Sequence, residues 1–275
     1  MDRYADLHVH TIYSDGSFTP EEVILRAKEL GFAAIGIADH DEVSGITEAI
    51  WIGHSHGIEI VPAVEISSGF NGKEIHLLGY LIDHNHRHLR ERLKEFRYER
   101  FKRTQRMVDR LRKLGIDISI ETVRKIGGRG SLGRLHLARA LFDRGCVRTV
   151  QEAFERYIGK DKPAYVEKPR IDIREAFELI SAAGGISVLA HPKLVRIDGS
   201  IPELVESGLR GIEAYCPKHA RDDTDRYLAI AAKYNLMVTG GSDCHGIIKD
   251  SALLGTVKLP YHYLAALRER ANQTP

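Results

Sequence analysis

The chain of 275 residues and 30.9 kDa can form one large α/β domain with an insertion or two domains, and its 43% hydrophobic and 28% charged residues, without a low-complexity tract, exclude a disordered protein. The net charge of +2 hides an asymmetry, because residues 87–113 carry +8 and the rest of the chain carries −6. No apolar run of 18 residues exists, and charges at Asp2, Arg3 and Asp6 exclude a signal-peptide core, so we expect a cytoplasmic protein without a membrane span.

Seven short apolar segments have the composition of buried β-strands. They alternate with amphipathic helical segments, and this alternation is typical of a parallel sheet or barrel wrapped in helices. We therefore expect an α/β fold whose strands are residues 4–9, 33–38, 58–64, 74–82, 185–190, 211–215 and 236–241.

The first predicted helix carries clear start and stop signals. Thr19 is a good N-cap, Pro20 suits the first helical position, Glu22 completes a capping box, and Gly31 ends the helix. Comparable patterns predict further helices over residues 44–56, 172–183 and 220–234 and from residue 261 onward.

The alternation is interrupted between residues 87 and 165. Residues 87–115 have the pattern of one long, strongly basic helix, and shorter helical segments follow. Because its charges are spread, this helix is more often a solvated surface than a nucleic-acid contact, although it could add salt-dependent attraction for RNA. We expect residues 1–86 and 166–275 to form the barrel and residues 87–165 to form a helical insertion.

Side chains that can bind metals fall at or near the ends of the predicted strands. In a barrel of parallel strands the carboxyl ends meet at one face, so residues distant in sequence converge there. Two histidines that are two residues apart on a strand also point to the same side. The set consists of His8, His10, Asp39, His40, Glu65, His76, His191, Asp243 and His245.

Imidazole combined with carboxylate is the ligand set expected for Zn, Mn or Fe. Cys146, Cys216 and Cys244 are isolated and lack CxxC spacing, which argues against a disulfide framework and against a zinc finger. Burying six histidines without a metal would be costly. The sequence therefore predicts a centre for divalent metal ions built from imidazoles and carboxylates.

Several motifs resemble those of the PHP (polymerase and histidinol phosphatase) superfamily. They are HxHTxxSDG at 8–16, ADHD at 38–41, VEIS at 64–67, IHLLGY at 75–80, LAHP at 189–192 and GSDCH at 241–245. The resemblance implies a metal-dependent phosphoesterase on a distorted seven-stranded (β/α) barrel. Residues 134–141 and 156–166 are similar to the insertion of the standalone branch, which acts on nucleoside 3′,5′-bisphosphates and trims short RNAs from the 5′ end, as RNase AM does.

The resemblance also implies a site for two or three divalent ions, which would be Mn, Fe or Zn. Each ion would have its own group of ligands: His8, His10, Glu65 and Asp243 for the first, Glu65 as a bridge with His76 and His191 for the second, and Asp15, His40 and His245 for the third. Some relatives carry a histidine where Asp15 stands, so the carboxylate could alter affinity or metal preference at the third position.

The implied chemistry is hydrolysis at phosphorus. Two ions ~3.5–4 Å apart can share a water, lower its pKa and direct the hydroxide in line. We expect a metal-bridging hydroxide to remove the 3′-phosphate of nucleoside 3′,5′-bisphosphates and to release 5′-nucleotides from short 5′-phosphorylated RNA. Asp39, His40 and Glu65 are the predicted catalytic residues, with Asp39 beside His40 as an orienter or proton acceptor. The alternatives are a histidinol-phosphate phosphatase and a non-catalytic nucleic-acid-binding domain.

Basic residues of the insertion are predicted to bind substrate phosphates. Arg134, His136 and Arg139 fall on one predicted helix, and arginine offers a planar fork to phosphate oxygens. Lys162 is a further candidate, while Arg139 fits a solvated helix surface equally well. The expected partner is a nucleotide or short RNA, with no membrane and no obligate protein partner.

Overall fold

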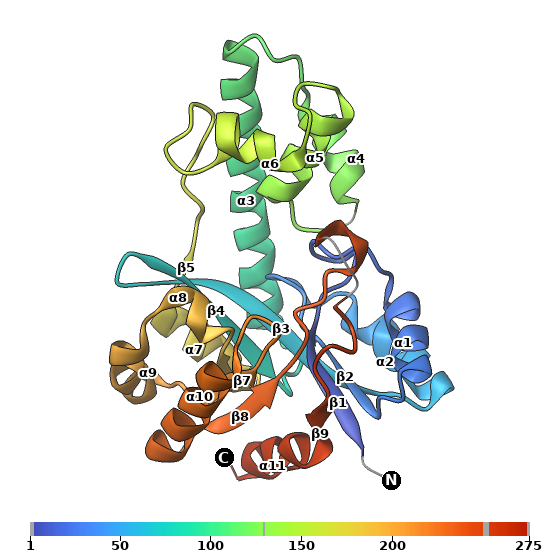
Figure 1. Cartoon of the computed structure of the whole chain (residues 1–275), viewed down its shortest axis with the longest axis vertical. Helices are drawn as coiled ribbons and strands as arrows, with labels where there is room; N and C mark the ends of the chain where they lie inside the picture. Colours follow the sequence, from blue (N-terminus) through green and yellow to red (C-terminus); the bar gives the residue numbers. More distant parts are fainter. Residues whose placement is uncertain (1–2, 129, 250–252, 274–275) are drawn as a thin grey trace.

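The computed structural model describes residues 3–128, 130–249 and 253–273 and has two lobes stacked along its long axis (Figure 1). The lower lobe contains a curved sheet with helices on its outside, and the upper lobe is helical. The strands are β1 (Tyr4–Val9), β2 (Ala34–Ile37), β3 (Glu59–Phe70), β4 (Lys73–Tyr80), β5 (Ile171–Asp172), β6 (Ile186–Leu189), β7 (Gly211–Tyr215), β8 (Met237–Gly240) and β9 (Leu259–Pro260).

The sheet forms a nearly closed barrel. Its strand order is β8-β7-β6-β4-β3-β2-β1-β9, with β5 paired to β3. The two ends approach each other where Val9 bridges Cys244 in parallel and the His10 amide donates to the Cys244 carbonyl at 2.9 Å. The expectation of a mixed α/β barrel is confirmed. All seven predicted strands are present in the described residues, together with the two-residue strands β5 and β9.

The expectation of a parallel sheet or barrel is wrong at β4, which runs antiparallel to both β3 and β6. Asn71 and Gly72, with φ of 47° and 75°, form the tight turn that joins β3 to β4. This hairpin extends β3 to Phe70, so Glu65 lies within the strand and not at its end as predicted. Because β4 is reversed, the beginning of that strand, where His76 lies, reaches the rim formed by the carboxyl ends of its parallel neighbours.

Helices cover the outside of the barrel and follow the predicted capping signals. At α1 (Pro20–Glu29), Thr19 and Glu22 form the predicted capping box. The other barrel helices are α2 (Ile46–His56), α7 (Ile173–Ala182), α8 (Pro192–Val195), α9 (Ile201–Ser207), α10 (Arg221–Tyr234) and α11 (Tyr261–Asn272), and two short 3₁₀ turns are η2 (Asp198–Ser200) and η3 (Gly246–Lys249).

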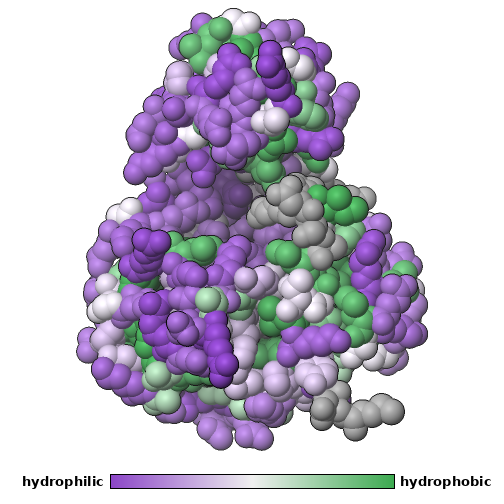
Figure 2. All heavy atoms as spheres, viewed as in Figure 1, coloured by the Kyte–Doolittle hydropathy of each residue, from purple (hydrophilic) through white to green (hydrophobic). Residues whose placement is uncertain are grey.

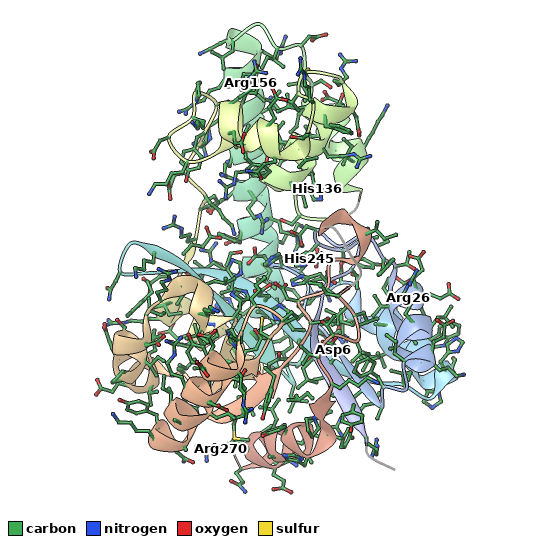
Figure 3. All side chains as sticks on the ribbon, in the orientation of Figure 1. Asp6, Arg26, His136, Arg156, His245 and Arg270 are labelled. Atoms are coloured by element: carbon green, nitrogen blue, oxygen red, sulfur yellow. The ribbon has the colours of Figure 1, made fainter. Side chains whose placement is uncertain are left out.

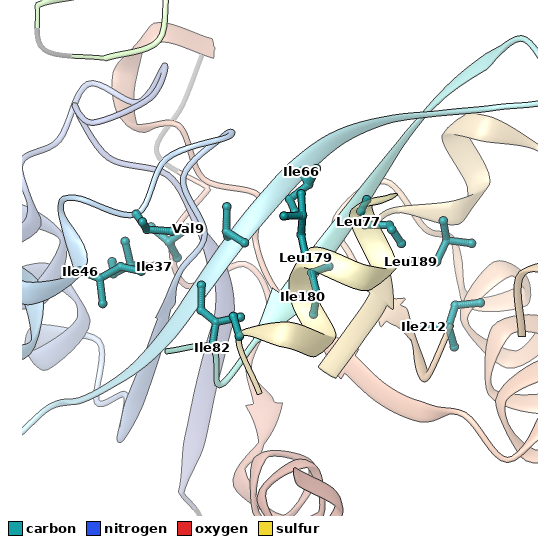
Figure 4. Close-up of a cluster of buried hydrophobic side chains, with 14 of the residues drawn as sticks. Val9, Ile37, Ile46, Ile66, Leu77, Ile82, Leu179, Ile180, Leu189 and Ile212 are labelled. Carbon is teal, nitrogen blue, oxygen red and sulfur yellow. The ribbon is translucent and has the colours of Figure 1, made fainter. Parts of the chain in front are cut away.

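The main hydrophobic core lies between the barrel strands and these helices (Figure 4). Ile37, Ile66 and Leu189 come from the strands, and Ile46 and Ile180 come from α2 and α7. All five side chains are buried, and burial of such a side chain contributes about 1.5–3 kcal/mol. The core therefore fixes the strands whose ends carry the polar residues of the rim.

The upper lobe has a hydrophobic cluster of its own. It contains α4 (Ile120–Gly127), α5 (Arg134–Asp143), α6 (Val150–Ala153), the π-helical turn η1 (Phe154–Ile158) and the upper part of α3 (Arg87–Lys113). The lower part of α3 packs on the barrel instead, through Leu89, Leu93 and Phe96. The helix α3 therefore joins the two cores as one continuous element (Figure 1). None of the helices in the described ranges is both long and apolar enough to cross a bilayer.

Candidate metal centre

Six histidines and three carboxylates converge at the upper rim of the barrel. The β1 strand and its extension carry His8 and His10, and a β-bridge between His40 and Glu65 continues the pairing of β2 with β3. The remaining members follow or lie within other strands: Asp15, His76, His191, Asp243 and His245. Residues separated by more than 200 positions thus share one small volume.

Glu65 is the centre of this cluster and is fully buried. Its Oε2 atom lies 3.3 Å from His8 Nε2, 3.2 Å from His10 Nε2 and 3.0 Å from His40 Nδ1. Its Oε1 atom lies 2.8 Å from His76 Nδ1 and 3.0 Å from His191 Nε2. A single carboxylate therefore contacts five imidazoles, as a bridging ligand would.

Three groups of these residues have the spacing of metal ligands, with ligand atoms within 4.8 Å of one another. They are His8, His10, Glu65 and Asp243; His40, Glu65 and His76; and His10, Asp15, His40 and His245. The first group has the composition expected for the first ion. The second group contains His40 beside the expected Glu65 and His76, and the third contains His10 beside its three expected ligands. His191 is not in the second group, but its Nε2 atom lies 3.0 Å from Glu65 Oε1.

The donor atoms fit divalent cations. His8 Nε2 and His10 Nε2 lie 3.1 Å apart, and His10 Nε2 is also 3.3 Å from Asp243 Oδ1. His40 Nδ1, Glu65 Oε2 and His245 Nε2 are buried and make no hydrogen bond of acceptable geometry. Buried polar atoms are normally satisfied, and a cation between these lone pairs would satisfy them.

Burial and mutual attraction set the charges of the ligands. Burial opposes charge on Glu65, but His40 and His76 outweigh it and hold the pKa of Glu65 well below its usual range. Burial lowers the pKa of His10, whereas hydrogen bonds with Asp243 and Glu65 raise it to about 9. Burial also lowers the pKa of His40 well below its usual value. Protons therefore compete with metal ions at His10, while His40 is neutral and able to bind a cation.

The backbone is strained where two ligands enter the site. His191 and Asp243 have φ of 29° and 50°, a region that residues other than glycine rarely adopt. Such strain costs about 1–3 kcal/mol per residue and persists only where the surrounding structure enforces it. The fold thus holds both side chains towards Glu65 and His8.

Glu213 is a positioning residue that sequence reasoning missed. It lies on β7 and is fully buried; its Oε1 is 2.9 Å from His8 Nδ1, and its Oε2 accepts the His191 amide at 2.7 Å. Carboxylates commonly accept the second N–H of a metal-bound histidine and so fix its tautomer. Asp6 has a related role, since its Oδ1 accepts the amides of His8 and Ser242.

The structure places Asp39 under the loop that carries Asp15. Its carboxylate accepts the Thr11 amide at 2.8 Å, the Thr11 hydroxyl at 2.6 Å and the Ser14 hydroxyl at 2.5 Å. Ser14 Oγ lies 3.5 Å from His10 Nδ1, so Asp39 acts on the ligands through this loop. Burial raises the pKa of Asp39 against these hydrogen bonds. A role for Asp39 in orienting the ligands stays a prediction, and these hydrogen bonds are the contacts through which it would act.

The predicted phosphate-binding residues divide into two pairs. His136 is buried on the underside of α5 and faces the barrel side that carries His245 (Figure 3). Arg134 is half-buried, with its guanidinium 5.8 Å from the ring centroids of Phe154 and Tyr165. Arg139 and Lys162 are exposed, and Arg139 pairs with Asp143 at 2.8 Å. The structure therefore brings His136 and Arg134, but not the other pair, to the space above the metal centre.

Three further basic residues beside this space were not predicted from the sequence: Arg100, Arg103 and Lys168. Arg103 is 3% exposed, donates Nε to the Val166 carbonyl at 2.8 Å, and leaves Nη2 buried without a hydrogen bond. Burial and repulsion by Arg134 and Arg100 lower the pKa of Arg103 to about 10. Lys168 Nζ lies 2.5 Å from Glu74 Oε1, which in turn contacts His76 Nε2 at 3.2 Å. We call Arg100, Arg103, Arg134, His136 and Lys168 the roof cluster.

The roof cluster lies between the lobes, where Figure 2 shows a hydrophilic recess. Arg100 donates to the Asp41 carboxylate at 2.5 Å, one residue from the candidate ligand His40. Burial lowers the pKa of His136 against the field of Asp15, so that imidazole is neutral. Buried guanidinium groups without matching carboxylates attract an anion strongly. The site as a whole thus combines a rim of candidate metal ligands with a group of basic side chains above it.

Comparisons with known proteins agree with this geometry. The family model described as PHP domain matches residues 6–239. A 5′-3′ exoribonuclease of Haemophilus influenzae is 33% identical over 250 residues, covering 89% of this chain and 91% of the relative. A 3′,5′-nucleoside bisphosphate phosphatase of Chromobacterium violaceum is 32% identical, with 87% and 86% covered. The solved structure of a metal-dependent phosphoesterase from Bifidobacterium adolescentis superposes with a TM-score of 0.88 at 30% identity, over 98% of this chain and 96% of that chain.

Proposed function

Because the chain belongs to the PHP domain family of phosphoester-cleaving enzymes, we propose that it removes the 3′-phosphate of nucleoside 3′,5′-bisphosphates and releases 5′-nucleotides from short 5′-phosphorylated RNA. The observation that carries this proposal is the position of the roof cluster above the metal-ligand cluster, with Lys168 linked to His76 through Glu74. One phosphate of the substrate would bind to the metal ions at the rim, and its other phosphate would bind to the arginines of the roof cluster.

The candidate ligands suit two or three divalent ions, of which Mn, Fe and Zn match imidazole with carboxylate. When bound, such ions would lower the pKa of a water and neutralise the phosphoryl oxygens. Glu65 would hold ions on both of its oxygens, and Glu213 would keep His8 Nε2 free of a proton. Asp39 would hold the loop that positions Asp15.

The roof cluster favours a substrate with a second phosphate. Arg103 and Arg134 have no carboxylate partner within the described part of the chain, so their charge is available to a bound anion. Ser131, three residues before the first residue of α5, contributes a buried hydroxyl oxygen without a hydrogen bond. The helix N-terminus beside it adds a partial positive charge. These groups would bind the 5′-phosphate.

A nucleoside 3′,5′-bisphosphate and the 5′ end of an RNA share the required chemistry. Each has a 5′-phosphate separated by one nucleoside from a phosphoester at the 3′ oxygen. If the roof binds the 5′-phosphate, the 3′ phosphorus reaches the rim in both substrates. Water would cleave the bond between phosphorus and the 3′ oxygen, which then takes up a proton, so both substrates would yield a nucleoside 5′-phosphate. The second product would be inorganic phosphate from the bisphosphate and the shortened 5′-phosphorylated chain from RNA. The expectation of a cytoplasmic enzyme belongs to this proposal.

Hydrolysis by Mn-loaded protein tests the proposal. The substrates are adenosine 3′,5′-bisphosphate, adenosine 3′-monophosphate, 5′-phosphorylated RNA and histidinol phosphate. We expect the bisphosphate and the RNA to be cleaved and the 3′-monophosphate to be cleaved much more slowly, because it lacks the anion for the roof. Cleavage of histidinol phosphate far above that of the bisphosphate would replace the proposed substrate, and turnover of none would reject it.

A further inference from the structure

The basic side of α3 lies outside the metal centre and is not used by the proposed reaction. Arg87, Arg90, Lys94 and Arg97 follow one another at three- or four-residue spacing, which places them along one side of the helix. They line a groove of about 330 Å³, whose other lining residues are Glu42, Val43, Ser44, Asn85 and Glu91. The groove therefore runs between α3 and the segment that follows His40 in the chain.

The middle of this groove has uncompensated positive charge. Arg87 pairs with Glu91 at 2.8 Å, and Arg97 pairs with Glu42 at 3.2 Å. Arg90 and Lys94 are exposed and form no ion pair with any residue in the described ranges. These two cations are available to an anionic partner, and their separation of about 6 Å along the helix axis suits successive phosphates of one strand.

An aromatic platform continues the groove along α3. The Tyr98 side chain is 58% exposed, and its ring lies parallel to that of Phe101, with centroids 6.5 Å apart and an interplanar angle of 11°. Lys102 Nζ lies 4.4 Å from the Tyr98 ring centroid, and the Arg124 guanidinium lies 6.0 Å from that of Phe101. Phe101 is partly buried against the core of the upper lobe, so Tyr98 is the exposed ring of this pair. An exposed aromatic ring beside cations is a surface on which a single-stranded base can stack.

The groove is linked to the metal centre through the backbone that follows His40. Arg97 donates to the Asp41 carbonyl at 2.9 Å, and Asp41 directly follows the candidate ligand His40. Along α3, the helix rises by about 22 Å from residue 87 to residue 102. Since one stacked nucleotide rises by about 3.4 Å, this length exceeds a mononucleotide and suits several nucleotides.

We propose that Arg90, Lys94, Arg97, Tyr98 and Lys102, the α3 track, bind the downstream nucleotides of a single-stranded RNA whose 5′ end lies in the metal centre. This inference rests on the proposed function, because only an RNA substrate extends beyond the site. The concave groove admits a strand but not a flat bilayer, and the stacked rings suit bases rather than a simple polyanion. Because only RNA reaches the track, the protein would bind RNA more tightly than it binds nucleoside bisphosphates.

Equilibrium RNA binding in EDTA tests the track without turnover. The probe is a fluorescent, 5′-phosphorylated oligoribonucleotide of roughly ten nucleotides, within the range bound by single-strand modules, titrated by anisotropy at several salt concentrations. The variants are Arg90→Ala with Lys94→Ala, and Tyr98→Ala. Arg112→Ala with Lys113→Ala is the control, since these exposed cations lie at the far end of the same helix.

The first variant is expected to reduce the slope of log affinity against log salt by about 1.4, at about 0.7 per charge for a single strand. The Tyr98→Ala variant is expected to weaken binding about five- to a hundredfold through the loss of one stacked base. The control should keep both the affinity and the slope of the parent. In Mn, the ratio of kcat/KM for RNA to that for the bisphosphate should fall in both track variants.

The inference would be overturned if all variants bound RNA as tightly as the parent, or if the control variant lost as much affinity as the track variants. It would also be overturned if Tyr98→Ala kept the full affinity of the parent and inorganic polyphosphate displaced the probe as well as unlabelled RNA does. If the track variants have lower RNA affinity in EDTA while the Mn-loaded parent cleaves no substrate, the proposed function is wrong and the α3 track is supported. If the parent cleaves the bisphosphate but the variants bind RNA as the parent does, the α3 track is wrong and the proposed function is supported.

Discussion

Replacing Glu213 by glutamine should prevent His8 from binding a metal ion, although Glu213 is not itself a candidate ligand. In the parent, Glu213 accepts the N–H at His8 Nδ1, which leaves the lone pair of His8 Nε2 directed towards Glu65 and Asp243. The amide of a glutamine presents N–H to His8 Nδ1 and turns that nitrogen into an acceptor. The proton then moves to Nε2, the atom that should bind a cation.

The size of the effect follows from the role of such a carboxylate. Loss of a residue that orients a metal-bound histidine typically weakens metal affinity 10–100-fold, which corresponds to about 1.4–2.7 kcal/mol. Glutamine keeps an oxygen for the His191 amide, which Glu213 accepts at 2.7 Å, so the local backbone should remain in place. The loss should therefore appear in metal affinity and in kcat, and only weakly in folding.

Competition of Mn with a fluorescent chelator, followed by phosphate release from the bisphosphate, measures both quantities. Glu206→Gln is the matched control, because Glu206 is exposed on α9. Melting of both variants in EDTA separates unfolding from loss of metal. If Glu213→Gln kept the Mn affinity and kcat of the parent, the assignment of Glu213 to the orientation of His8 would be refuted.

Three further predictions concern the roof, the packing under the site and the charge of its ligands. Arg103→Met should lower kcat/KM for the bisphosphate about 10–150-fold, because a hydrogen bond to a charged group contributes about 1.5–3 kcal/mol, and it should change hydrolysis of the 3′-monophosphate little. Parallel loss on both substrates would contradict this role. Gly241→Ala would place a Cβ 2.4 Å from the His8 backbone nitrogen and should lower both Tm and Mn content, whereas Gly199→Ala, whose Cβ meets open space, should change neither. Burial lowers the pKa of His10 but Asp243 and Glu65 raise it to about 9, so the stabilisation by protonated His10 is complete below pH 6.5 and is lost as pH rises through about 9. The Tm of chelated protein should therefore fall over that window while Mn affinity rises, and a flat or rising Tm would contradict the assigned charge.

Much of the barrel could be predicted from the sequence because its signals are local. The capping box of Thr19 and Glu22 starts α1 as expected, and the apolar segments became strands. The β3–β4 hairpin was missed although Asn71–Gly72, a strong two-residue hairpin signal, lies between the strands. The repeated alternation of strands and helices led to the parallel interpretation, which the turn chemistry overrides.

The ligand cluster was predictable because its members sit in compact motifs near strands. Glu213 was not, since a buried glutamate inside the apolar strand β7 gives no signal until its partners are known. Arg103 and Lys168 reach the site only through the path of the chain between the lobes, which no local pattern encodes. Arg139 lies five positions after Arg134, about 140° around the helix, and this rotation turns it to solvent.

The central claim is that Glu65 joins imidazoles and acids from separate strands into one centre for several cations. Anomalous diffraction from a crystal soaked in manganese tests it directly. We expect at least two strong peaks in contact with Glu65. One should also contact His8, His10 and Asp243, and the other should also contact His40 and His76. A map with no peak at Glu65, in a crystal whose protein hydrolyses the bisphosphate, would contradict it.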